Sequence, residues 1–413
     1  IDIMIMSILI ILYFYLEFIF KELTPIEIER FRVIYVISGL FSLISFPFTS
    51  LNGVLIAYEK FVFLKSTELI RKIGVIIFIV IALLLGYKLY ALVLINAIIG
   101  LFIISIKIYY LVKKTKVSIN YRYKSKDLLI ELFKTSFWVS IIVIAQRFLI
   151  LLAPTILAIY SGTTEIAIFS IAMVIEGYIY TIANGLNGMF LAKISRLSNA
   201  MKRESVTLLM IKVGRLQLFL VGLVIIGLFV FGKEFVVLWV GFNFERSYYV
   251  LLFLVASSLI TTTQGVAHTL MFVEDKLKYS AFMFILSAVI SVIISIYLTP
   301  ILGAVGASIG VFTGVLCGQV IGMNIVYMKV LKLDIIYFFR ECHIKFMPIL
   351  VITFIIGYFI QMHAPATSLV LFFPKVLILT FIYIVMMWVF GVNNFEKELI
   401  SGTLKKLKTK IKL

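Results

Sequence analysis

The chain has 413 residues, of which 63% are hydrophobic and only 14% are charged, and its mean hydropathy is +1.15. Soluble proteins carry roughly 25% charged residues, so this composition excludes a water-soluble globular protein and requires lipid as the solvent. The net charge of +18 does not predict nucleic-acid binding, because the basic residues lie in short connections between apolar runs. There they orient a membrane protein and contact anionic lipid.

The apolar runs predict transmembrane helices. They are longer than the ~10-residue alternating segments of a transmembrane barrel and approach the ~20 residues that a helix needs to cross hydrocarbon. The sequence therefore predicts an all-α integral membrane protein with about twelve spans. The predicted spans are 1–20, 33–57, 73–87, 89–112, 136–160, 166–191, 217–232, 249–272, 280–299, 304–328, 346–362 and 368–391.

Lysine and arginine alternate between the connections. Of 38 such residues, 29 lie in the even-numbered connections and the C-terminal tail, and six lie in the odd-numbered ones. Basic loops stay on the cytoplasmic side of a membrane. The pattern predicts a multi-pass protein of the cell membrane with a cytoplasmic C-terminus. The start at Ile1, inside an apolar run, is expected not to be the natural start.

Three basic residues fall inside predicted spans. Lys107 and Lys375 lie near span ends and are expected to reach the headgroups with their long side chains. Arg147 lies near the middle of its span. Polar residues in hydrocarbon are costly and mark cavities or partners. The candidates for substrate binding are Gln146, Arg147, Glu176, Asn184, Asn187, Gln264 and His268, with Gln319 and Asn324 as further polar positions.

Two interpretations of Arg147 stay open. It either forms a buried ion pair with Glu176 that specifies packing, or it supplies a cationic site for an anionic substrate such as a phosphate. Because Arg147 follows Gln146 directly, only one of the two can point straight inward. The amides have the corresponding alternative of interhelical hydrogen bonds.

Other patterns concern packing and chemistry. Gly306, Gly310, Gly314 and Gly318 form a ladder of spacing four, which predicts close approach of another helix. No phosphate-binding loop, catalytic triad or pair of carboxylates at catalytic spacing is visible, and three histidines and two cysteines are too scattered for a metal cluster. We therefore expect a protein that is not an enzyme and that has no metal and no cofactor.

Three segments, 47–61, 168–172 and 298–308, resemble the polysaccharide flippases. They are similar to that family's asparagine–glycine segment, its tyrosine–serine–isoleucine–alanine run (with Phe169 in place of tyrosine) and its proline followed by glycine-x-x-glycine–alanine–alanine. The family comprises O-antigen and teichoic-acid-type transporters of the multidrug/oligosaccharidyl-lipid/polysaccharide exporter superfamily.

The resemblance implies two six-helix lobes and an extra C-terminal helix pair. With twelve spans, the chain looks like a member that lacks its first two helices. It would then divide into the remainder of the N-terminal lobe, a basic cytoplasmic interlobe loop, a C-terminal lobe, the extra pair and a basic tail. The corresponding ranges are 1–112, 113–135, 136–328, 346–391 and 392–413.

The function implied by the resemblance is flipping of a polyprenyl-diphosphate-linked oligosaccharide by alternating access. Arg147 would contact the diphosphate, and the amides and His268 the sugar hydroxyls. Glycan-assembly enzymes and anionic lipid are the implied partners. The alternatives are a cation-coupled multidrug exporter of the same superfamily, a membrane-embedded polysaccharide polymerase or ligase, and a passive channel. Acidic residues in the spans would favour the exporter, a large external loop the enzyme, and a repeated filter sequence the channel.

Overall fold

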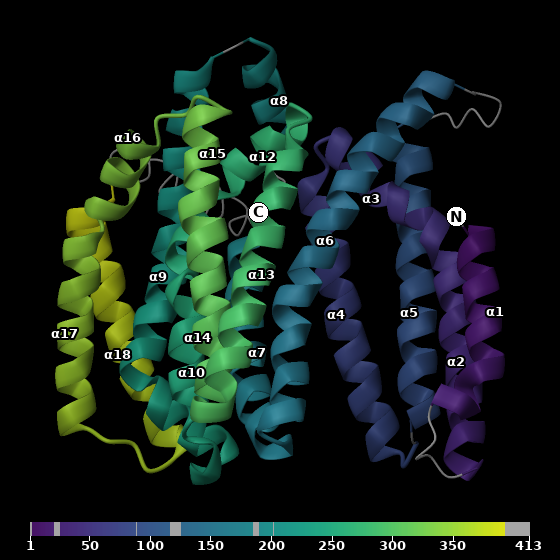
Figure 1. The fold of residues 1–413 in the computed structure, drawn as a ribbon, viewed down its shortest axis with the longest axis horizontal. Helices are drawn as coiled ribbons and strands as arrows, with labels where there is room; N and C mark the ends of the chain where they lie inside the picture. Colours follow the sequence, from purple (N-terminus) through teal and green to yellow (C-terminus); the bar gives the residue numbers. More distant parts are fainter. Residues whose placement is uncertain are drawn as a thin grey trace, which may run out of the picture. The chain divides into compact units, whose positions relative to one another are not determined.

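The computed structural model describes residues 2–19, 25–87, 89–115, 125–184, 190–200 and 202–392. All regular secondary structure in these residues is helical (Figure 1). Ten helical segments among them are long and apolar enough to cross a membrane. The predicted all-α membrane fold is confirmed. The ten segments cover all the predicted spans except 1–20 and 73–87, which correspond to the helices α1 and α4.

The chain divides into two compact units, residues 1–124 and 125–413. The first contains α1 (Asp2–Ile19), α2 (Pro25–Ser45), α3 (Ser50–Ala57), α4 (Phe61–Leu84) and α5 (Leu89–Tyr110). The predicted span 33–57 is not one regular helix. A 3-10 turn, Phe46–Thr49, separates α2 from α3, because Pro47 has no amide hydrogen to continue the α-helical ladder.

In the first unit, the expectation that Lys107 reaches the headgroups is wrong. Its side chain is buried rather than extended toward the headgroups, and Nζ donates a 2.8 Å hydrogen bond to Asn52 Oδ1 in α3. The ammonium group is thus bound by a neighbouring helix, which lowers the cost of keeping it in an apolar environment.

The second unit contains the remaining helices. They are α6 (Lys126–Tyr160), α7 (Thr163–Asn184), α8 (Leu191–Asn199), α9 (Arg203–Val240), α10 (Ser247–Ala256), α11 (Ser258–Thr261), α12 (Gly265–Val273), α13 (Leu277–Leu302), α14 (Ala304–Val315), α15 (Met323–Lys329), α16 (Ile335–Phe339), α17 (Met347–His363) and α18 (Leu369–Met386). Its buried core is made mainly by α9 with the helices around it.

Two helices of this unit are longer than predicted. α6 begins at Lys126 instead of residue 136, and α9 spans Arg203–Val240 instead of 217–232. The length of the apolar run underestimates the length of a helix that continues through charged residues. Arg215, placed by the sequence in a connection, is instead a buried residue of α9.

The glycine ladder lies where α14 meets α13. A Cβ atom on Gly310 would lie 2.7 Å from Ser295 N and 2.8 Å from Ser291 O, both on α13. Such distances are shorter than van der Waals contact, so only glycine permits this approach. Ser295 Oγ also donates a 3.2 Å hydrogen bond to Ala307 O across the same interface. The ladder therefore fixes the register of the two helices.

The C-terminal pair α17 and α18 packs side by side and against α9 (Figure 1). Lys375 of α18 does not reach outward as expected. Its side chain is 4% exposed and forms an ion pair with Glu234 of α9. Nζ also donates hydrogen bonds to Gln361 Oε1 at 2.6 Å and to Ala364 O at 3.3 Å. The buried ammonium group is therefore fully bound.

Charged groups also join helices at the α12–α13 turn. Glu274 accepts hydrogen bonds from the side chains of Arg203, Lys276 and Ser198. Burial alone raises the pKa of this carboxyl, but the three hydrogen bonds outweigh it and lower the pKa to about 2. The neighbouring Asp275 pairs with Lys134 of α6 at 2.5 Å. The turn is thus fastened to α6, α8 and α9.

Glu165, near the start of α7, also joins helices, at the end of α6 opposite to Lys134. Its carboxylate accepts hydrogen bonds from Arg246 at 2.5 Å and from the amide of Ala304, the first residue of α14, at 2.7 Å. Gly303 precedes α14 with φ +60°, and a Cβ there would lie 2.8 Å from the Glu165 carboxyl carbon. The turn therefore favours glycine twice, through its backbone and through the contact.

Candidate functional site

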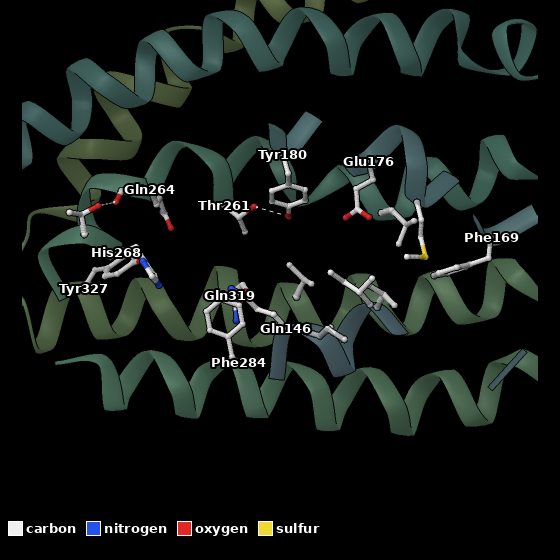
Figure 2. A pocket seen from close by; sticks show the side chains of 18 residues that line it. Gln146, Phe169, Glu176, Tyr180, Thr261, Gln264, His268, Phe284, Gln319 and Tyr327 are labelled. Carbon is white, nitrogen blue, oxygen red and sulfur yellow. Dashed lines mark hydrogen bonds between the residues drawn. The ribbon is translucent and has the colours of Figure 1, made fainter. Parts of the chain in front are cut away.

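A cavity of about 460 Å³ lies inside the second unit (Figure 2). Its walls come from α6, α7, the interrupted helix α10–α12, α13, and the α14–α15 segment. The lining residues are Gln146, Leu149, Ile150, Phe169, Met173, Glu176, Tyr180, Leu254, Thr261, Gln264, Gly265, His268, Thr269, Phe284, Val311, Val315, Gln319 and Tyr327. This volume falls within the range of about 300–1,000 Å³ that is typical of small-molecule sites.

Polar groups face one another across this cavity. Figure 2 shows Glu176 and Tyr180 projecting from α7 on one side, with Gln146 and Gln319 on the other. Among the described residues of the lining, Glu176 carries the only carboxylate, and none is a lysine or an arginine. Within the described part of the chain, the Glu176 carboxylate has neither an ion-pair nor a hydrogen-bond partner. The cavity thus offers acceptors and hydroxyls and favours a neutral polar or cationic ligand.

Three of the polar side chains are held by neighbours outside the lining. Gln264 Nε2 donates a 2.8 Å hydrogen bond to Asn324 Oδ1, and Gln319 Nε2 donates to Ser287 Oγ at 3.3 Å. His268 Nε2 lies 3.4 Å from Ser280 Oγ. These bonds occupy one polar atom of each side chain and orient the rest. Oriented amides are the groups that could bind a polar ligand with little further loss of side-chain entropy.

The structure brings together four of the seven predicted substrate-binding residues, Gln146, Glu176, Gln264 and His268, and the further polar position Gln319. Arg147 does not line the cavity, and its side chain is exposed. Successive residues of a helix are turned by about 100° from one another, so Gln146 takes the inward position on α6 and Arg147 is turned away.

The other predicted site residues are not placed in the cavity. The ion pair considered between Arg147 and Glu176 is not present among the described residues: Glu176 lines the cavity, whereas Arg147 is exposed and lies outside the lining. Asn184 is the last residue of α7, and its side chain is not among those that the structure describes. Asn187 lies outside the described residues altogether.

Sequence reasoning missed Tyr180 and Thr261, whose hydroxyl groups lie 3.5 Å apart at the cavity wall. A signal for Tyr180 was present. Residues four apart share a helical face, so the face that carries Glu176 also carries Tyr180. Thr261 gave no such signal, because it lies where α11 ends and a 3-10 turn begins.

The described residues contain no group of three or more histidine, cysteine or acidic side chains that could hold a metal ion. The glutamine, histidine, threonine and tyrosine side chains of the lining can recognise a ligand by hydrogen bonds. Amides and hydroxyl groups match sugar hydroxyls, and a carboxylate matches a hydroxyl or a cation.

No family model matches the chain, and the search of curated proteins found no match. Among solved structures the chain is similar to one described as "Lipid II flippase MurJ, inward closed conformation". The similarity covers 96% of this chain and 82% of that one, with a TM-score of 0.63 and 15% sequence identity. At this identity the likeness concerns the fold. The chain is a multi-pass membrane protein whose helical fold is similar to that of this solved structure.

Proposed function

We propose that this protein is a flippase that moves a lipid-linked oligosaccharide across the cell membrane. The observation that carries the proposal is the fold, which is similar over 96% of the chain to that of a protein named for flipping lipid II. The loop charges support a cytoplasmic C-terminus. Transport from the cytoplasmic leaflet to the outer leaflet is what the resemblance to the polysaccharide flippases implies.

In this proposal the cavity of the second unit binds sugar hydroxyls. Gln146, Gln264 and Gln319 supply amides on opposite walls, and Glu176 supplies an acceptor. An anionic diphosphate is disfavoured there, because the described lining has a carboxylate and neither a lysine nor an arginine. Arg147 stays a predicted diphosphate ligand outside this cavity, since its guanidinium group is exposed and suits bidentate phosphate binding.

A second candidate is a cation-coupled exporter of small molecules. Acidic residues in the spans favour this function, but an ion pair between Glu176 and Arg147 would leave the Glu176 carboxylate unable to hold a cation. The carboxylate of Glu176 instead faces the cavity without an ion-pair partner among the described residues, and an unpaired carboxylate attracts a cation. This observation makes the exporter a stronger alternative than the sequence alone suggested.

Reconstitution in proteoliposomes separates the two candidates. A polyprenyl-diphosphate-linked oligosaccharide in the inner leaflet is monitored by an external enzyme that labels its sugar, and a fluorescent organic cation is monitored in parallel vesicles. The flippase proposal expects labelling that Gln146→Leu and Glu176→Gln reduce at least tenfold, while Glu204→Gln, at an exposed glutamate of α9, has no effect. Movement of the cation alone would replace the proposal by the exporter.

Arg147 is tested in the same vesicles. As a diphosphate ligand it should tolerate lysine poorly, because lysine offers a point charge without the bidentate fork. Arg147→Lys and Arg147→Met should both lower labelling, while the protein is recovered at the level of the parent. Normal labelling with Arg147→Met would remove Arg147 from the site.

A further inference from the structure

The cavity wall contains an interrupted helix. α11 ends at Thr261, a 3-10 turn occupies Thr262–Gln264, and α12 begins at Gly265. The hydroxyl groups of the threonines donate to main-chain carbonyls, as Thr263 does to Ile260 O at 2.8 Å. Such side-chain bonds compete with the helical ladder and bend helices. The bend therefore follows from a run of three threonines.

The interruption leaves carbonyl groups to be satisfied from elsewhere. Leu259 lies in the last turn of α11, and carbonyls of a last turn have no amide partner within their own helix. His343 Nε2 lies 3.2 Å from Leu259 O and 3.3 Å from Thr263 Oγ1. A carbonyl oxygen can only accept, so Nε2 carries the hydrogen and donates it to Leu259.

The surroundings hold the His343 ring in this position. It lies edge-on to Phe338, with centroids 5.4 Å apart, and against Phe339 at 4.9 Å. Its Nδ1 is buried and has no hydrogen-bond partner in the described residues. A neutral ring with the hydrogen on Nε2 satisfies this arrangement, because Nδ1 then has no hydrogen to donate.

His343 belongs to a segment that is itself anchored. The helical turn Arg340–Ile344 joins α16 to α17, and Arg215 of α9 donates a 2.9 Å hydrogen bond to Glu341 O in this turn. Arg215 also donates to Gly391 O at 2.6 Å, and its guanidinium carbon lies 4.5 Å from the centre of the Phe346 ring. The hydrogen bond from His343 thus links the interrupted helix to the C-terminal helices.

We propose that His343 is a positioning residue for the cavity. By binding the carbonyl of Leu259, it fixes the bend through which Thr261 and Gln264 reach the cavity wall. The C-terminal helices α17 and α18, which contribute no residue to the lining, thereby control the shape of the site. Any effect of His343 on transport rests on the proposed function. Its effect on the shape of the cavity does not.

The test uses the purified full chain in lipid nanodiscs and a methanethiosulfonate reagent. Thr269→Cys reports on the cavity beyond the bend, and Met173→Cys reports on the α7 wall. Both are placed in a Cys317→Ser background, because Cys317 is partly accessible and Cys342 is buried. The parent without a reporter measures residual labelling.

Loss of one neutral hydrogen bond corresponds to about a two- to tenfold change in a conformational equilibrium. His343→Phe, which keeps a ring but has no donor, should change the labelling rate at residue 269 by this factor and leave residue 173 unchanged. His343→Gln should restore the rate, because its amide nitrogen reaches the place of Nε2. His343→Asn, whose amide reaches only the place of Nδ1, should not.

Unchanged labelling at residue 269 in His343→Phe would overturn the proposal, as would equal changes at both reporters, which indicate general loosening. Failure of His343→Gln to restore the rate would also overturn it, since ring packing would then be the cause. None of these readouts requires transport. If the reporters behave as expected and no lipid-linked sugar is flipped, the proposed function fails and the positioning role of His343 stands.

Discussion

Replacement of Lys375 by methionine should destabilise the second unit strongly. The side chains of Lys375 and Glu234 are 4% and 10% exposed, so the variant leaves a buried carboxylate without its counter-charge. Removing one partner of a buried ion pair costs about 3–5 kcal/mol. Gln361 and Ala364 lose a donor as well. Because a large domain loses roughly 2 °C of melting temperature per kcal/mol, we expect a decrease of about 6–10 °C.

The assay is thermal unfolding of the purified protein in detergent, followed by intrinsic fluorescence. Lys329→Met, at an exposed lysine of α15, is the control and should leave the melting temperature unchanged. The double variant Glu234→Leu, Lys375→Met should recover most of the loss, since apolar packing often replaces a buried pair. A single variant that melts like the control would refute the reasoning, because Lys375 would then reach water or headgroups as the sequence suggested.

Three further outcomes follow from the structure. The pKa of Glu274 is about 2 in the folded chain against an ordinary value of 4.5. The ionised Glu274 carboxylate therefore contributes its full stabilisation of the fold above pH 4.5 and loses it as the pH falls toward 2. Acid should therefore lower the melting temperature less in Glu274→Gln than in the parent. Gly310→Ala should cost about 1–3 kcal/mol through overpacking, whereas Gly227→Ala, with no atom within 4 Å of its Cβ position, should be harmless in the same melting assay. In intact cells, an impermeant thiol reagent should label a cysteine at Thr163 and should not label one at Ser118. The reverse pattern would contradict the predicted orientation.

Composition and loop charge were sufficient to predict the fold class, because lipid leaves helices as the simplest way to satisfy backbone hydrogen bonds. They were insufficient for helix ends and for the surroundings of single charges. Lys107 and Lys375 are buried and bound, whereas Arg147 is exposed. Depth along a span can be read from the sequence, but the direction of a side chain around the helix depends on which neighbours pack there.

The candidate site was predictable only in part, because the sequence gives the depth of a residue along a span but not the direction of its side chain. Gln264 and His268 lie four residues apart, and both line the cavity as residues on one helical face do. The position of Glu176 was predictable, but its lack of an ion pair with Arg147 was not, because that depends on the rotation of α6. His343 could not have been found from sequence, since its partner carbonyl becomes available only where α11 ends.

The interface between α13 and α14 has a consequence for how this sequence can evolve. The main chain around Ser295 fills the space that a side chain at residue 310 would need, so residue 310 cannot carry a side chain while the two helices stay in place. Because a Cβ at residue 310 would clash with main-chain atoms of Ser291 and Ser295, no substitution at either serine removes the clash, and a viable replacement at Gly310 would require separation of the two helices. Among related chains, glycine should therefore persist at this position, while exposed residues on the outer faces of the same helices drift independently.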